Sequence, residues 1–190
     1  KYSLNDLNEF NIEFYGISDA DTIFNPTSHS YFNLNPSENS IFKHSLKINS
    51  EKYIPVDKQR IPIKSIRNVF KTPFDFILPK RINKHFDLNN DQLQKTNGYD
   101  HCFVLKKNKN NIAAELSDEI SGRKLTIITD QPGIQLYSGN YLEEKFKKNQ
   151  GICLETQNFP NSPNINGFPS SILNAGKEYY SITTYQFSLI

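Results

Sequence analysis

Alternating apolar and polar residues predict β-strands near both ends of the chain and in its first quarter. Phe10, Ile12 and Phe14 alternate with polar neighbours, which is the two-residue period of a strand that buries one face. The same period recurs over residues 42–48 and again over residues 185–189. We therefore expect half-buried strands in these three segments.

Further strands are predicted where short apolar runs lie next to turn residues. Asn97-Gly98 and Pro132-Gly133 are turn dipeptides, and Ser121-Gly122 joins two apolar runs that are expected to pair. The apolar or extended runs cover residues 22–24, 102–105, 113–116, 125–129, 134–137 and 152–154. Most of the chain is thus expected to be built from short strands.

Residues 51–97 have a different pattern, because they are rich in proline and show no clean period. We expect long loops with short strands there, and a single helical turn near residues 91–93. No window of the chain has sustained helical spacing, and its 10 prolines oppose long helices. No repeat or linker divides the chain, so the pattern predicts one all-β domain.

Composition and charge exclude several classes of protein. The 14 phenylalanines and 10 tyrosines supply a bulky core although hydrophobic residues make up only 36% of the chain. A net charge of +2 gives no electrostatic footprint for nucleic acid or an anionic membrane. No apolar run is long enough to span a membrane, and no signal peptide opens the chain, so we expect a cytoplasmic protein.

Two further features bear on the origin of the chain. Cys102 and Cys153 form neither a disulfide framework nor a C-x-x-C motif, so both are expected to be small apolar residues in strands in a reducing compartment. The chain begins at Lys1 and contains no methionine. It is therefore expected to be processed or to be a fragment.

Glu155 is the first candidate for chemistry. It ends the apolar run 152–154 and precedes an amide-rich loop broken by Pro160 and Pro163. A carboxylate at the edge of an apolar strand can have its pKa raised toward neutrality, as a general base requires. We therefore place a functional site at this strand end.

Each of the other candidate residues has a structural alternative. His29 lies in an extended segment between Pro26 and the Tyr31-Phe32 pair, where a histidine is often structural. Asp100 follows Gly98 and can act as a turn residue that accepts backbone hydrogen bonds, and Gln135 can be an ordinary strand amide. His101 should point to the opposite face from Asp100.

Two catalytic classes lack their signatures in the sequence. No H-x-x-x-H motif or other metal-ligand spacing is present, so no metal site is expected. The G-x-S-x-G elbow of hydrolases that use a Ser-His-Asp triad is also missing. His44 and His85 belong to no motif and are expected to be surface or packing residues.

Four segments of the chain resemble the aldose 1-epimerase (galactose mutarotase) family, in the family's order. The segments are N-P-T-S-H-S-Y-F-N-L at 25–34, N-G-Y-D-H-C-F-V-L at 97–105, P-G-I-Q-L-Y-S-G-N-Y-L at 132–142 and L-E-T-Q-N-F-P-N-S-P-N at 154–164. The resemblance implies a large antiparallel β-sandwich, the mutarotase supersandwich. It also implies that residues 1–190 are its C-terminal part, carrying most of the sugar site. The family's upstream segment, which carries an arginine and a second histidine, has no counterpart in this chain, so a missing N-terminal half is expected to complete the fold.

The resemblance also implies roles for the candidates. Glu155 would be the general base and His29 the general acid, while Asp100 and Gln135 would bind sugar hydroxyls. The implied reaction interconverts the α and β anomers of a free hexose such as glucose or galactose, and it needs no cofactor. Tyr31, Phe32 and Phe159 are candidates to pack on the sugar ring.

Two alternatives of other classes stay open at this point. A non-catalytic sugar-binding protein on the same fold would keep the pocket and lose turnover. A glycoside hydrolase would use two carboxylates, and Asp100 with Glu155 would supply them.

Overall fold

The computed structural model describes residues 1–37 and 40–190, and its strands form two large sheets and one small one. The seven-stranded sheet has the order β1 (Tyr2–Leu4), β2 (Glu9–Ile17), β15 (Glu178–Leu189), β11 (Arg123–Thr129), β10 (Ile112–Asp118), β5 (Ser45–Ile48), β8 (Lys80–Arg81). The six-stranded sheet has the order β4 (Tyr31–Phe32), β13 (Ile152–Gln157), β12 (Gly133–Tyr137), β9 (Asp100–Val104), β6 (Lys52–Ile54), β7 (Arg67–Asn68). β3 (Thr22–Ile23) pairs with β14 (Ile172–Leu173).

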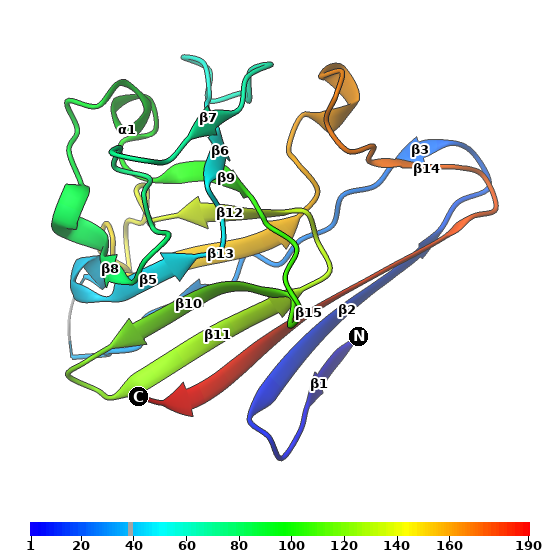
Figure 1. Cartoon of the computed structure of the whole chain (residues 1–190). Helices are drawn as coiled ribbons and strands as arrows, with labels where there is room; N and C mark the ends of the chain where they lie inside the picture. The colour runs from blue at the N-terminus through cyan, green and yellow to red at the C-terminus, as the bar shows by residue number, and fades with distance from the viewer. Residues whose placement is uncertain (38–39) are drawn as a thin grey trace.

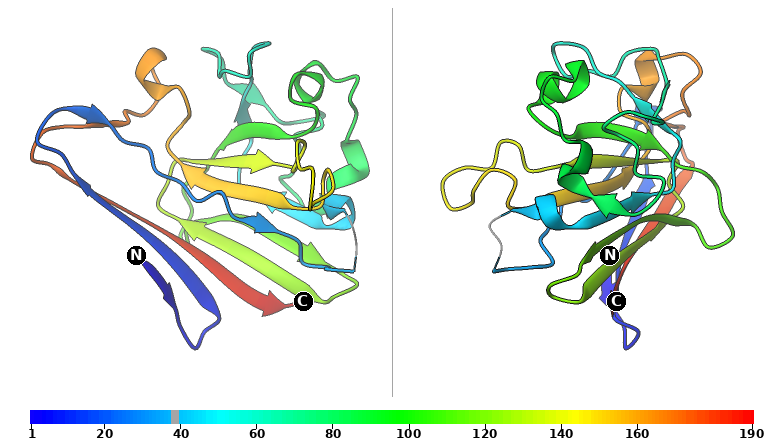
Figure 2. Two further views of the ribbon diagram at one scale, coloured as in Figure 1. Left: turned by 180° about the vertical axis from the view of Figure 1, so that it is seen from behind. Right: turned by 60° about the vertical axis from the view of Figure 1, so that its left-hand side comes forward.

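The two large sheets pack face to face, as the ribbon views show (Figures 1 and 2). One core joins them, with Ile12, Leu125 and Ile127 from the seven-stranded sheet and Ile134 and Leu136 from the six-stranded sheet all buried in it. Pairing is antiparallel throughout the three sheets of the described chain. The prediction of an all-β antiparallel sandwich is confirmed.

β2 and β15 form the longest ribbon of the molecule. They pair from Glu178 opposite Ile17 to Gln186 opposite Glu9 and extend beyond the six-stranded sheet toward β3 and β14 (Figure 1). The alternation near residue 12 does produce a strand with Ile12 in the core. The closing strand is longer than the predicted 185–189, because residues 178–184 also find partners on β2 and β11.

In residues 1–37 and 40–190, helical structure is confined to short pieces: α1 (Asp91–Thr96) and the 3-10 turns η1 (Ile41–Lys43), η2 (Ile82–His85) and η3 (Ser162–Asn164). α1 confirms the predicted turn near residue 91; Asn90 caps its start, and Asn97 adopts the left-handed conformation at its end. Among the described residues, no helix is long and apolar enough to cross a membrane.

The strand predicted over residues 42–48 is wrong in its first part. Phe42 lies in η1, where its backbone N–H donates to the Ser40 side chain, and its ring packs 4.7 Å from the ring of Phe86. The ladder begins only at Ser45. The apolar residue at 42 therefore marks a capped turn that packs on the core, which strand periodicity alone does not distinguish.

Candidate active site

The face of the six-stranded sheet that points away from the core carries the candidate residues. On β9, His101 and Phe103 are fully buried, with Phe103 in the core, whereas Asp100 occupies an alternate position of the strand. On β12, Gln135 lies between the core residues Ile134 and Leu136 and so faces the same way as Asp100. The predicted separation of His101 from Asp100 is thus confirmed.

Strand register brings three of the candidates together. Gln135 is opposite Glu155 on β13 and opposite Cys102 on β9, while Tyr137 is opposite both Asp100 and Cys153. The amide of Gln135 lies between the two carboxyl groups, and its Nε2 donates to Asp100 Oδ1 over 2.7 Å. Gln135 Oε1 is buried without a hydrogen-bond partner in the described part of the chain, so a ligand hydroxyl would satisfy it.

His29 is held beside Glu155 by the residues that precede it. Asn25 and Asn158 exchange hydrogen bonds, with Asn25 Nδ2 donating to Asn158 O over 3.1 Å and Asn158 N donating to Asn25 Oδ1 over 2.8 Å. Thr27 Oγ1 donates to Thr156 O over 2.9 Å, and beyond His29 the strand β4 pairs with β13. These anchors fix the extended segment along β13 and leave His29 Nε2 3.6 Å from Glu155 Oε1.

The environment of Glu155 suits proton transfer near neutral pH. Burial raises the pKa of its carboxyl group to about 7; the nearby His29 lowers that pKa and the carboxylate of Asp100 raises it. The His29 side chain is 52% exposed and the Glu155 side chain only 9%, so the imidazole faces solvent while the carboxyl group lies beneath it. The pair can therefore exchange protons with a ligand that approaches from this side.

Asp100 is prepared to accept hydrogen bonds. Burial raises the pKa of its carboxyl group, while the hydrogen bond from Gln135 and the charges of Arg60 and His29 lower it. Arg60 lies in the loop after β6 and places its guanidinium carbon 5.2 Å from the ring centroid of Tyr141. A cationic group thus lies near the Asp100 end of the site.

Gly98 and Asn140 lock the strand that carries Asp100. Gly98 has φ +141°, and an added Cβ would lie 2.2 Å from Asn140 Oδ1. Asn140 Nδ2 in turn donates to Thr96 O and Tyr99 O, each over 2.9 Å. The close approach of Asn140 to Gly98, together with its hydrogen bonds to Thr96 and Tyr99, therefore forms a contact, here called the clamp, that joins the start of β9 to the residues after β12.

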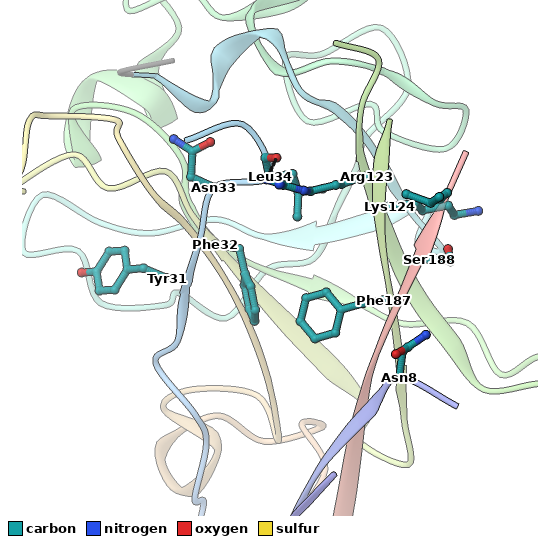
Figure 3. Close-up of a pocket in the computed structure, with 10 residues that line it drawn as sticks. Asn8, Tyr31, Phe32, Asn33, Leu34, Arg123, Lys124, Phe187 and Ser188 are labelled. Carbon is teal, nitrogen blue, oxygen red and sulfur yellow. Dashed lines mark hydrogen bonds between the residues drawn. The ribbon is translucent and has the colours of Figure 1, made fainter. Parts of the chain in front are cut away.

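Of the three aromatic candidates, Tyr31 is at the site. Its ring centroid lies 5.0 Å from that of His29, and burial raises the pKa of its phenol to about 12. Phe32 points to the other side of β4, where its ring lies beside that of Phe187 (Figure 3). Phe159 is 5% exposed and packs in a small cluster with Cys102, so it is not free to stack on a ligand.

Tyr137 was missed by the sequence reasoning. Its ring centroid lies 5.7 Å from that of His29 and 6.2 Å from that of Tyr31. A signal was present, because Tyr137 is two residues after Gln135 in the same strand and must share its face. An aromatic wall of Tyr31 and Tyr137 therefore borders the histidine.

The cavity drawn in Figure 3 lies next to this site. It has a volume of about 570 Å³ and opens between the segment from Tyr31 to Leu34 and the end of β15 at Phe187 and Leu189. Tyr31 lines it, but Glu155, Asp100 and Gln135 do not. Since β4 is the last strand of its sheet, this hollow follows a sheet edge, and we place the chemistry on the face bearing Glu155.

The remaining histidines are structural. His44 is buried, and its Nε2 accepts a hydrogen bond from Leu34 N over 2.9 Å. Burial lowers the pKa of His101 to about 3, and its ring packs 4.7 Å from that of Phe74. His85 ends η2 at the surface. The prediction that His44 and His85 are packing or surface residues is confirmed.

The fold also assembles a set of potential metal ligands that the spacing along the sequence did not reveal. One ligand atom each from His29, Cys153 and Glu155 lies within 4.8 Å of the other two. Cys153 Sγ is 3.3 Å from His29 Nδ1. His29 is more than a hundred residues before the other two, so no local motif can show this grouping.

Comparison with protein families matches the whole site region. A sequence model of the aldose 1-epimerase family matches residues 1–186. The aldose 1-epimerase of Haemophilus influenzae is 36% identical over 197 residues, which cover 98% of this chain and 57% of that protein. The galactose mutarotase of Sus scrofa is 39% identical over 178 residues, covering 88% of this chain and 51% of that protein. The chain spans about half the length of these curated relatives.

Solved structures give the same picture of the fold. An aldose epimerase homologue from C. elegans superposes with a TM-score of 0.88 at 27% identity, covering 100% of this chain and 58% of that one. A galactose 1-epimerase from Lactobacillus acidophilus superposes with a TM-score of 0.86 at 32% identity, covering 99% of this chain and 55% of that one.

Proposed function

The chain belongs to the aldose 1-epimerase family, and on this basis we propose that its protein interconverts the α and β anomers of free hexoses such as glucose and galactose. The observation that carries the proposal is the pairing of Glu155, whose pKa burial raises to about 7, with the imidazole of His29 3.6 Å away. Ring opening needs a base that is ionised near neutral pH and an acid close to it.

In the proposed reaction, Glu155 takes the proton of the anomeric hydroxyl while His29 gives a proton to the ring oxygen. The bond between C1 and the ring oxygen breaks, the C1–C2 bond rotates, and the ring closes on the other face of C1. On closure the proton transfers run in reverse, so acid and base are both restored. No electron or group leaves the sugar, and the proposed steps use only side chains of this chain.

Asp100 and Gln135 are proposed to hold the sugar hydroxyls. The hydrogen bond between them orients the Asp100 carboxyl group and leaves its other oxygen for a hydroxyl donor. The buried, unpartnered Oε1 of Gln135 offers a second acceptor toward the same ligand. Positioning the ring from one side would keep C1 and the ring oxygen over Glu155 and His29.

We further propose that residues 1–190 are the C-terminal part of a single sandwich domain that an N-terminal segment completes. The relatives are longer, since the match covers 57% of one and 51% of another. In the described chain, β1 and β4 each lie at the edge of a sheet, and the hollow beside β4 is open. A cytoplasmic location is proposed as well, in keeping with two buried free thiols.

The test is polarimetry with freshly dissolved α-glucose and α-galactose, using the longest natural protein that contains this chain. We expect the optical rotation to reach equilibrium faster than the spontaneous reaction. Release of free sugar from a disaccharide would instead identify a glycoside hydrolase. Saturable sugar binding without acceleration would identify a binding protein.

A further inference from the structure

We propose that His29, Cys153 and Glu155 form a binding site for a zinc ion and that zinc switches the catalytic pair off. Binding itself does not depend on the proposed function, whereas the inhibition rests on it. The evidence is the geometry of the three side chains and the chemistry of their donor atoms.

The donor set matches zinc. One thiol sulfur, one imidazole nitrogen and one carboxylate oxygen are each common ligands of this ion, and three protein ligands with an open fourth position are typical of zinc sites that accept water. Hard cations such as Mg²⁺ prefer oxygen-only sites, so the cysteine argues against them. The fourth position would take water or a sugar hydroxyl.

The distances fit a tetrahedral site after a small movement. With zinc bonds of about 2.0–2.3 Å, neighbouring ligands of a tetrahedral ion lie about 3.3–3.7 Å apart. Cys153 Sγ and His29 Nδ1 are 3.3 Å apart, and the three donors lie within 4.8 Å of one another. Closing the remaining gap needs a shift of about 1 Å, which the half-exposed His29 ring can supply.

Each member of the set is placed by a different structural constraint. Cys153 and Glu155 are two residues apart on β13 and therefore point to the same face. His29 is brought over them by the hydrogen bonds of Asn25 and Thr27 to the residues that follow Glu155. The site is thus built by the same anchors that assemble the catalytic pair.

Zinc binding and catalysis exclude each other on this geometry. A metal-bound Glu155 cannot accept a proton, and loss of this base alone stops the proposed reaction. Binding also has to release the protons of its ligands, so the apparent affinity should increase with pH. Zinc is therefore expected to act as an inhibitor that weakens as the solution is acidified.

Cobalt is the direct probe, because Co²⁺ occupies zinc sites and a cobalt–thiolate bond absorbs in the near ultraviolet. Titrating Co²⁺ into the protein should produce this band, and added Zn²⁺ should remove it. The Cys153→Ala variant should lack the band. The matched control is Cys102→Ala, which removes the other buried thiol, outside the ligand set, and should keep it.

Activity gives the second readout. Zinc should slow mutarotation by the complete protein, and Cys153→Ala should need at least about tenfold more zinc for the same inhibition, because even loss of an outer-shell partner typically costs 10–100-fold in affinity. Absence of the cobalt–thiolate band, or its retention in Cys153→Ala, would overturn the zinc site even if mutarotation is found. A band with no mutarotation would leave the zinc site standing and count against the proposed enzyme.

Discussion

At the scale of single residues, Glu155 acquires its proposed chemistry from its neighbours. It is one of six consecutive buried residues of β13, and a carboxyl group in such a strand has lost most of its hydration. His29, 126 positions earlier in the chain, brings its imidazole to 3.6 Å from this carboxyl group. The base is therefore defined by a contact between distant segments.

Replacing Glu155 by Gln keeps the size of the side chain but removes the base. We expect turnover to fall by about 10²-fold or more, the usual scale for loss of a general base. Polarimetry of the complete protein measures this. The control is Glu115→Gln, which removes a carboxylate paired with Lys47 and Lys124 outside the site and should leave turnover near normal. A near-normal rate in Glu155→Gln would remove this residue from the mechanism.

His29→Asn should lower turnover far more than it weakens sugar binding, because the proposed role is proton transfer. Both quantities have to be measured in the same variant, turnover by polarimetry and affinity by calorimetry. Loss of affinity with unchanged turnover would make His29 a binding residue instead of the acid.

The pH dependence follows from the direction of the Glu155 shift. The base must be ionised, so the rate should rise with pH through about 7.

The stability of the fold should change with pH in the opposite sense to the rate. Because the folded-state pKa is raised above the usual 4.5, the stabilising effect of protonated Glu155 is full below pH 4.5 and is lost as the pH rises through about 7. Denaturant unfolding of the native protein and Glu155→Gln across this range should show that the variant lacks this part of the pH dependence.

The sequence identified the four candidate residues but not all of their surroundings. Glu155 was recognisable because a charged residue at the end of an apolar strand is unusual in a core, whereas Asp100 was singled out by the family resemblance. Tyr137 could have been found from its two-residue spacing to Gln135. The contact of Cys153 with His29 could not be found, since it depends on how two distant segments align along β13.

At the scale of elements, the clamp between β9 and β12 is the feature most open to test. Gly98→Ala should destabilise the protein by about 3 kcal/mol or more, because alanine at this φ is strained and its Cβ would displace Asn140 from its hydrogen bonds. Unfolding in urea measures the change. Gly122→Ala is the control: its φ is +68° but nothing lies within 4 Å of the added Cβ, so the expected cost is only about 1 kcal/mol. Equal costs at the two positions would show that the contact with Asn140 does not matter.

Strand existence was predictable and strand extent was not. The apolar runs of β10, β11, β12 and β13 gave the correct elements, since each has a face or both faces buried. The length of β15 depends on partners at the other end of the chain, which leave no mark in its own residues. The turn at Ile41–Lys43 was predicted as strand because its apolar residues pack on the core, although they join no strand ladder.

At the scale of the whole molecule, we predict that residues 1–190 alone do not epimerise sugars and tend to associate. Edge strand β1 exposes Tyr2 and Leu4, which are 71% and 75% exposed, and an exposed apolar edge invites pairing with another chain. Mutarotation above the spontaneous rate and the size of the particle in solution are to be measured for this chain and for a longer natural protein that contains it. Leu4→Lys should reduce association of the isolated chain if β1 is the contact. Full activity of the isolated chain would show that its site needs no further segment.

The ribbon of β2 and β15 also constrains the order in which this protein can fold during its synthesis. Asn11 of β2 accepts a hydrogen bond from Thr184 of β15, 173 residues later, so this partner of β2 leaves the ribosome long after β2 itself. Until then β2 cannot complete its pairing, and the residues that face the core from it stay uncovered. Pairing over so long a separation is slow. Until β15 has emerged, the growing chain is therefore expected to expose apolar strand residues, which is the kind of surface that general chaperones bind.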